Sequence, residues 1–284
     1  MTNLITCITQ NRTYGEQEKL AILGLYCINI AYASVANIIA LVAIWKLYRR
    51  ELGRTPKLLI SLFVANLLLV LAIVLLYCTR SFVATENSEL FSIQMEIIIF
   101  LSMWSCVTLT IISIDRYLLV IRGTIYVKWK KYFHVCFSLA FAFCLVYVIA
   151  FHLVVFIYDC DSILVILTLL VAILMTNVIS SILTNFLMMR YVQRCLLSDT
   201  ASRARLRDTV ARTLLWMTVA ASFTQLAVIS LIVTYICGIA YGTFTTKNNE
   251  IIITTMPILI LFQSGTIPFI YFFRNVRMRH IIFS

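Results

Sequence analysis

An acid and a base stand side by side in this chain, at Asp115 and Arg116, and Tyr117 follows them. They end a long apolar stretch, in the run Ser-Ile-Asp-Arg-Tyr-Leu-Leu-Val-Ile over residues 113–121. A carboxylate and a guanidinium placed together can form a charge-assisted contact stronger than a neutral hydrogen bond. A simpler interpretation is a pair of helix-end charges that reach for water, although this would not require the apolar residues on both sides. The pair is the best candidate for a functional switch.

A second set of candidates lies inside other apolar stretches. Pro268 and Tyr271 come near the end of the last stretch, and Asn37 and Asn66 lie within the first and the second. A proline in a membrane helix frees a backbone carbonyl and permits a kink. A buried amide can donate hydrogen bonds to a neighbouring helix. These residues therefore either couple the helices during a movement or only kink and join them.

Seven apolar runs must position these residues. Each is long enough for a helix to cross about 30 Å of hydrocarbon, and the predicted spans cover residues 20–45, 57–79, 91–119, 134–157, 163–190, 211–237 and 250–273. The first run is too long for a signal peptide and has basic residues at its far end, so we expect it to stay as a span. The predicted organisation is a tail over 1–19, a membrane domain over 20–273 and a short tail over 274–284.

The composition excludes a water-soluble fold. Hydrophobic residues make up 62% of the 284 residues and charged residues 12%, against about 45–50% and about 25% in soluble domains. A membrane barrel would need short segments of alternating polarity, which the sequence lacks. The net charge of +11 does not indicate nucleic-acid binding, because the basic residues sit between apolar runs rather than on a soluble face. We predict an all-α membrane protein, a seven-transmembrane helix bundle in a lipid bilayer.

The basic residues also predict how the chain crosses the membrane. Of the 23 Lys and Arg residues, 19 fall on one side of the predicted spans, and only Arg12, Lys19, Arg80 and Lys247 fall on the other. Most acidic residues lie on that Lys-poor side. Because cytoplasmic loops retain positive charge, we expect a multi-pass plasma-membrane protein with its N-terminus outside and its C-terminus in the cytoplasm.

Several of these motifs are similar to those of rhodopsin-like (class A) G-protein-coupled receptors. Residues 115–117 resemble the family's D-R-Y box and fall at the third of seven spans. Residues 268–271, Pro-Phe-Ile-Tyr, resemble its N-P-x-x-Y motif, and residues 62–68, Leu-Phe-Val-Ala-Asn-Leu-Leu, resemble L-A-x-x-D-L-L. Asn37 suits the family's polar position in the first span. The resemblance covers the architecture of the whole chain and implies a receptor that switches a heterotrimeric G protein.

The chain also departs from the family pattern. Ile267 replaces the asparagine before the proline, and Asn66 replaces the second-span aspartate. The outer cysteine of the third span is missing near Phe91, the fourth span has no tryptophan and the fifth has no proline. In the sixth span Gln225 and Ala227 stand where the tryptophan and proline of C-W-x-P are expected. We therefore expect the sixth span to move about a different hinge.

The resemblance implies a two-state mechanism biased by a ligand. Asp115 is expected to hold Arg116 in the resting state. Outward movement of the sixth span would free Arg116 to meet Tyr271 and the G protein. Asp208, near the start of that span, is either a second partner for Arg116 or a solvated loop acid.

Ion and metal sites have little support in the sequence. Family members bind a sodium ion beside the second-span aspartate, and here only Ser105 remains next to the uncharged Asn66. We expect weak or no sodium regulation and raised basal activity. No C-x-x-C pair and no His and Cys cluster occurs, so no metal site and no cofactor is predicted.

The ligand is the least readable part. The third span has isoleucines at 97–99 where amine receptors need an aspartate, and 251–273 lacks the lysine that opsins need. Glu96 lies at the outer mouth and is either a contact for a basic ligand or a solvated acid. The acidic outer side favours a basic peptide or protein, and paired cysteines in the tail and the third outer loop would resemble chemokine and related peptide receptors. A constitutive receptor without a conventional pocket is the alternative.

The outer side also carries candidate modifications. Asn11-Arg12-Thr13 is a glycosylation acceptor if the tail is outside. Cys7, Cys78, Cys160 and Cys237 lie on the same side and could form two disulfides in an oxidising compartment. Of three possible pairings, we prefer Cys78 with Cys160 and Cys7 with Cys237. On the other side, the apolar and basic residues over 274–284 predict a short interfacial helix, and a divergent chain with so short a tail would suit an orphan or virus-encoded receptor.

Other classes of protein fit less well. A transporter or channel with a seven-helix bundle is the main alternative, but such proteins usually place several ionisable groups in mid-membrane. A bitter-taste-like receptor would fit the missing third-span cysteine but not the motifs at 115–117 and 268–271. An intramembrane hydrolase could use Ser264 beside Gly265, but no histidine is suitably placed as its base. We therefore do not expect an enzyme.

Overall fold

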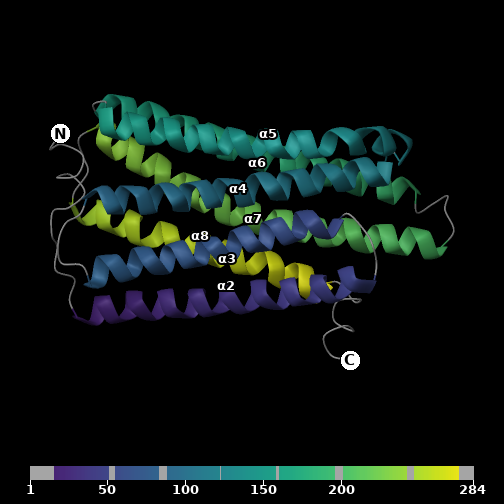
Figure 1. Ribbon diagram of the computed structural model, residues 1–284, viewed down its shortest axis with the longest axis horizontal. Coiled ribbons are helices and arrows are strands. Elements are labelled where there is room, and N and C mark those ends of the chain that lie inside the picture. Colours follow the sequence, from purple (N-terminus) through teal and green to yellow (C-terminus); the bar gives the residue numbers. More distant parts are fainter. Residues whose placement is uncertain are drawn as a thin grey trace.

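The computed structural model describes residues 16–50, 55–82, 88–121, 123–157, 160–195, 201–241 and 246–274, and all elements in these ranges are helices (Figure 1). The helices are α2 (Glu16–Arg50), α3 (Thr55–Phe82), α4 (Ser88–Ile121), α5 (Gly123–Ile157), α6 (Cys160–Cys195), α7 (Ala201–Ala240) and α8 (Thr246–Arg274). They run antiparallel along one axis, so α2 begins at one end of the bundle and α8 ends at the other (Figure 1).

Each predicted span falls within one of these helices. All seven are long and apolar enough to cross a membrane, so the predicted seven-helix membrane bundle is confirmed. Two helices begin well before their spans, α5 at Gly123 instead of 134 and α7 at Ala201 instead of 211. In α7 the added first turns contain Ala, Arg and Leu, which favour helix in water as well as in lipid. In α5 they contain Gly, Thr, β-branched and aromatic residues, and only their Lys residues are strong helix formers. The predicted outer tail up to residue 15 and the interfacial helix after Arg274 lie outside the described residues.

Six helices close into a ring around the core. α2 packs against α3 and α8, α3 against α4, α4 against α6, α6 against α7, and α7 against α8. α5 lies outside this ring and packs mainly against α4 (Figure 1). In the apolar window of α4, 56% of the residues are buried, compared with 11% in α5. α4 is therefore the most buried of the seven spans, and most of α5 faces the surroundings.

The core consists of two apolar clusters separated by buried polar residues. One cluster contains Tyr26, Leu69 and Ile98, and the other contains Ile44, Phe63 and Met217. Between them lies a polar layer, to which each of the six ring helices contributes. Its members are Asn37, Asn66, Ser105, Thr108, Ser181, Asn185, Ser222, Thr224, Gln225, Gln263 and Ser264. Buried polar groups away from water favour hydrogen-bond partners, and several members of this layer find them on a neighbouring helix, so the layer joins helices to one another.

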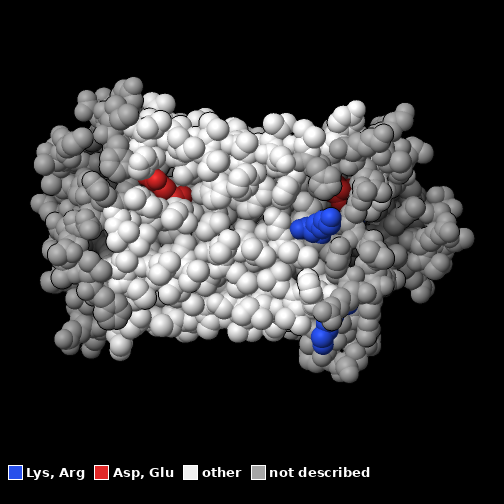
Figure 2. All heavy atoms as spheres, viewed as in Figure 1, with Lys and Arg blue, Asp and Glu red and all other residues white. Residues whose placement is uncertain are grey.

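Charge marks one end of the bundle. Every Lys and Arg side chain that the structure describes lies near the end of the bundle where α4 ends at Ile121 and α8 ends at Arg274. On the face shown in Figure 2, the blue atoms gather toward that end, and the middle of the face is free of charge among its described atoms. We call this end the basic end. An uncharged middle with charges toward the ends is typical of a helical bundle that crosses a bilayer.

Candidate functional site

Asp115 and Arg116 lie at the basic end, in the last two turns of α4. Asp115 is only 7% exposed, and the hydroxyl of Tyr126 in α5 donates a hydrogen bond to its carboxylate. Among the described side chains, no ion pair joins Asp115 to Arg116, although the positive charge of Arg116 acts on the carboxylate. Adjacent residues on a helix do not face each other. The expected direct contact is therefore not formed in this structure, and Tyr126 holds the carboxylate instead.

The aromatic residues of the two motifs lie against the same apolar cluster at the basic end. Tyr117 and Tyr271 are both partly buried and pack on it. The rings of Tyr271 and Phe63 have their centroids 6.0 Å apart, which places the α8 motif beside α3. The alternative partner of Arg116, Asp208, has a side chain outside the described part of the chain. The two motifs are thus brought to one end of the bundle, with α4 and α8 each supplying one.

The centre of the bundle holds a junction of α2, α3, α4 and α8. Pro268 is buried inside α8 and has no N–H, so the carbonyl four residues before it, at Ser264, has no partner within the helix. That carbonyl oxygen accepts hydrogen bonds from Asn37 Nδ2 at 3.0 Å and from Asn66 Nδ2 at 3.4 Å. Ser105 Oγ then donates to Asn66 Oδ1 at 2.7 Å. The amides predicted to join helices therefore do so, and they bind the carbonyl that the proline frees.

Ser264 and Gly265, the residues considered for hydrolysis, have other contacts here. Ser264 is 2% exposed, and its hydroxyl donates to the carbonyl of Leu261 at 2.9 Å. A Cβ atom added at Gly265 would lie 2.6 Å from Cε1 of Tyr32 and 3.0 Å from the Cα of Ala33. Gly265 therefore allows α8 to approach α2 closely enough for Asn37 to reach the freed carbonyl.

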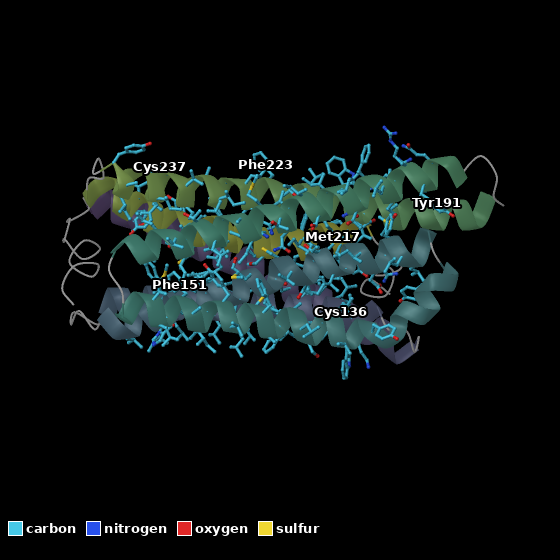
Figure 3. The ribbon with its side chains drawn as sticks, turned by 90° about the horizontal axis from the view of Figure 1, so that it is seen from above. Cys136, Phe151, Tyr191, Met217, Phe223 and Cys237 are labelled. Carbon is cyan, nitrogen blue, oxygen red and sulfur yellow. The ribbon has the colours of Figure 1, made fainter. Side chains whose placement is uncertain are left out.

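A second junction joins α4, α7 and α8 around a thiol. The side-chain nitrogens of Gln225 and Gln263 both donate to the sulfur of Cys106. All three side chains are buried. Gln225 stands where the family has tryptophan, and α7 points it inward while the nearby Phe223 points out of the bundle (Figure 3). This position of α7 therefore holds an amide that donates to a thiol of α4.

A third junction, between α4, α6 and α7, was not predicted from the sequence. On α6, Asn177, Ser181 and Asn185 follow one another every four residues and so lie on one face. Thr110 Oγ1 in α4 lies 2.8 Å from Ser181 Oγ and 3.2 Å from Asn177 Oδ1. Asn185 reaches Ser113 of α4 and Thr218 of α7. The four-residue spacing of polar residues on α6 was the available signal, although it did not reveal which helices they meet.

Glu96 lies in α4 near the end opposite the basic end. Its side chain is 8% exposed, and both carboxylate oxygens lie 2.9 Å from Nδ1 of His152 in α5. The His152 side chain is 40% exposed. A solvated acid does not fit this burial. The carboxylate is instead paired across two helices, and its predicted role as a ligand contact stays a prediction.

The predicted modification sites are only partly described. Cys78 and Cys237 are exposed and have free thiols in the structure, and Cys237 lies toward the end opposite the basic end (Figure 3). The side chain of Cys160, together with Cys7 and Asn11, lies outside the described residues. Both disulfide pairings and the glycosylation therefore remain predictions. Within the described residues, no three His, Cys, Asp or Glu side chains gather as a metal site would require.

Comparison with known proteins finds no matching family model and no similar curated protein. The chemistry of the bundle must therefore be inferred from its geometry. Three junctions join six helices at mid-bundle, and one end holds a buried acid with an arginine beside it. Such a bundle can adopt two packings of its helices that differ in a few hydrogen bonds. The two packings can expose different groups at the basic end.

Proposed function

We propose that this chain is a divergent rhodopsin-like G-protein-coupled receptor that passes a signal from outside the cell to a heterotrimeric G protein. The observation that carries the proposal is the central junction. Asn37, Asn66 and Pro268 belong to the stretches that resemble family motifs, and they meet at one carbonyl oxygen, that of Ser264. Unrelated kinks and isolated amides would have no reason to converge in this way.

The junction links the two ends of the proposed switch. α8 carries both the freed carbonyl and Tyr271, and α4 carries both Ser105 and Arg116. A shift of α8 at Ser264 therefore reaches Ser105 through Asn66, and α4 carries it along its length to Arg116. Because packed interfaces have discrete arrangements rather than continuous ones, a ligand that favours one packing would change what the basic end offers to a G protein.

The basic end is the cytoplasmic face in this proposal. A plasma-membrane receptor with its C-terminus inside would carry most of its Lys and Arg there. The opposite side is acidic in sequence, which favours a basic peptide or a chemokine-like protein as the ligand. Glu96 could contact such a ligand only if its contact with His152 were broken. Glycosylation at Asn11 and the disulfides Cys78–Cys160 and Cys7–Cys237 would belong to that outer face. Constitutive activity without a ligand is the other form that the proposal allows.

A transporter or channel is the less supported alternative. Within the described spans, no Asp, Glu, Lys, Arg or His lies near mid-membrane, and Glu96 and Asp115 lie toward opposite ends. The polar layer is made of uncharged amides, hydroxyls and a thiol, and the side-chain nitrogens of Asn66, Asn185 and Gln225 in it donate hydrogen bonds to other helices. Groups already bonded to one another are poorly suited to carrying an ion or a polar solute.

The test is a panel of G-protein activation sensors co-expressed with the wild type and with Arg116→Ala. We expect a basal or ligand-induced signal that Arg116→Ala abolishes at equal surface expression. Arg190→Ala is the matched control, because Arg190 is an exposed arginine near the basic end that stacks on Phe186 of its own helix, 4.9 Å from the ring centroid. Solute flux into vesicles that survives Arg116→Ala, with no G-protein signal, would favour the transporter and overturn the proposal.

A further inference from the structure

We propose that Asn185 of α6 is the latch that keeps α7 in its closed position, and that its bond to Thr218 breaks when the basic end opens. This inference rests on the proposed function, because it names the contact that regulates the helix movement of the receptor. Asn185 would be a positioning residue, acting on Arg116 through the helices and not by touching a ligand or a G protein.

Asn185 is fully buried between three helices. Its exposed fraction is 0%, and its Nδ2 atom lies 2.8 Å from Thr218 Oγ1 in α7, 3.1 Å from Ser113 Oγ in α4 and 2.8 Å from the carbonyl oxygen of Ser181 in its own helix. An amide nitrogen carries two hydrogens, so three acceptors share them. The Oδ1 atom of Asn185 has no hydrogen-bond partner among the described residues.

This surplus of acceptors makes the contact to α7 easy to release. When α7 moves away, both amide hydrogens still have an acceptor, at Ser181 and at Ser113. The hydroxyl of Thr218 can turn back to a carbonyl of its own helix, as Thr224 does one and a half turns later, where its Oγ1 lies 3.1 Å from the carbonyl oxygen of Ala220. Opening therefore breaks one interhelical bond without leaving a hydrogen-bond donor unpaired in hydrocarbon, where an unpaired donor is costly.

The central junction has no such reserve. The carbonyl of Ser264 depends on Asn37 and Asn66 because Pro268 has no N–H to offer it. Separating α8 from α2 and α3 would leave that oxygen without a protein partner. The α4, α6 and α7 junction can open without that cost. Like the junction around Cys106, it contains α7, the helix whose movement the proposed function requires.

The latch also lies close to the arginine that it would control. Ser113 precedes Arg116 by three residues on α4, which is about one helical turn. On α7, Met217 points into the bundle next to Thr218 and is 0% exposed (Figure 3). Withdrawal of Thr218 would therefore remove Met217 from the apolar cluster at the basic end, against which Tyr117 packs. Asn185 therefore bridges α7, at Thr218, to α4 one turn from Arg116, at Ser113.

The experiment uses two variants that break the latch and two that keep it. Thr218→Val removes the hydroxyl at nearly constant shape, and Asn185→Leu removes the amide. Thr218→Ser retains the hydroxyl. Asn177→Leu is the matched control, because Asn177 lies on the same face of α6 and bonds to Thr110 of α4 and to its own helix, but not to α7.

Two readouts are taken on the full chain in lipid nanodiscs and in cells. The first is the distance between labels introduced as unnatural amino acids at Trp216 of α7 and Tyr132 of α5, both exposed. The second is the basal G-protein signal at matched surface expression. We expect Thr218→Val and Asn185→Leu to raise the ratio of open to closed molecules, and with it the basal signal, by about three- to twentyfold, the change that one interhelical hydrogen bond in a membrane is worth. The double variant should add little to either single one.

Unchanged distances in Thr218→Val, or an equal change in Asn177→Leu, would overturn the latch. If Asn185→Leu does not reach the cell surface, the label distance and basal signal of Thr218→Val are compared with those of Thr218→Ser, and this comparison tests the latch. The failure of the latch is distinguishable from failure of the proposed function. If the wild-type signal depends on Arg116 but the distance between the labels is the same in Thr218→Val as in the wild type, only the latch is rejected. If the distance between the labels changes in Thr218→Val but the chain activates no G protein, only the receptor function is rejected.

Discussion

The side-chain nitrogen of Asn37 lies 3.0 Å from the carbonyl oxygen of Ser264. This contact crosses from α2 to α8, and it meets the carbonyl that Pro268 leaves without a partner in its own helix. The proline and the asparagine lie far apart in the chain and act on one atom.

Loss of the Asn37 amide should weaken the bundle. We expect Asn37→Ala to lower the free energy of unfolding by about 1–2 kcal/mol, because a buried carbonyl loses a donor in the membrane interior. Thermal unfolding of the purified protein in nanodiscs measures this. Asn29→Ala is the control, since Asn29 also donates to the carbonyl four residues earlier, that of Leu25 at 2.9 Å, but is partly exposed and donates to no other helix among the described residues. Equal destabilisation by both changes would contradict the role of the junction.

A carboxylate at the second-span position should make the protein respond to sodium. In Asn66→Asp, one carboxylate oxygen would face the carbonyl of Ser264 where Nδ2 now donates at 3.4 Å, and two oxygens without a hydrogen between them repel. A bound cation or a proton would relieve this repulsion. We expect the thermal midpoint of Asn66→Asp to rise when sodium chloride replaces choline chloride at equal ionic strength, and that of the wild type to stay the same. A wild type with strong sodium dependence would disprove the prediction.

The close approach of α2 and α8 should not tolerate a side chain at Gly265. A Cβ atom there would lie 2.6 and 2.7 Å from ring carbons of Tyr32 and 3.0 Å from the backbone of Ala33. We expect Gly265→Ala to cost about 1–3 kcal/mol of stability through overpacking, and Tyr32→Ala to relieve only part of it because the contact with the Ala33 backbone remains. Gly24→Ala is the control, since nothing lies within 4 Å of its Cβ position, and it should be neutral or slightly stabilising. A Gly265→Ala protein as stable as Gly24→Ala would show that the helices separate freely.

The pair formed by Glu96 and His152 should be sensitive to loss of the histidine. His152→Ala removes the histidine that contacts a carboxylate only 8% exposed, and we expect a loss of about 1–3 kcal/mol. This is less than the cost of breaking a fully buried pair, because the histidine itself is 40% exposed. Adding Glu96→Gln to His152→Ala should recover part of the loss, since the amide has no charge to bury. A double-mutant cycle on thermal unfolding gives the coupling, and strictly additive changes would mean that the two side chains do not interact in the bilayer.

The described part of the fold was largely predictable, because the membrane reduces it to a question of length and polarity. A helix that satisfies its own backbone must be apolar for about twenty residues to cross hydrocarbon, and seven such runs are visible in the sequence. Helix ends were less predictable: α5 and α7 begin well before their apolar runs, α7 through residues that favour helix in any solvent and α5 through residues that mostly do not. The candidate residues Asn37, Asn66 and Pro268 were also found, since polar and helix-breaking residues are conspicuous in apolar runs.

The sequence by itself determined that the chain is a seven-helix membrane protein and which of its residues are polar enough to need a partner inside the membrane, because residue type decides which side chains carry polar groups into hydrocarbon. Only the tertiary structure decided which groups meet. Asn185 with Thr218, Glu96 with His152, and Asp115 with Tyr126 instead of Arg116 each depend on how one helix is rotated about its axis and which neighbour it packs against. Those rotations are set by the combined packing of all the helices, so no single segment contains the information.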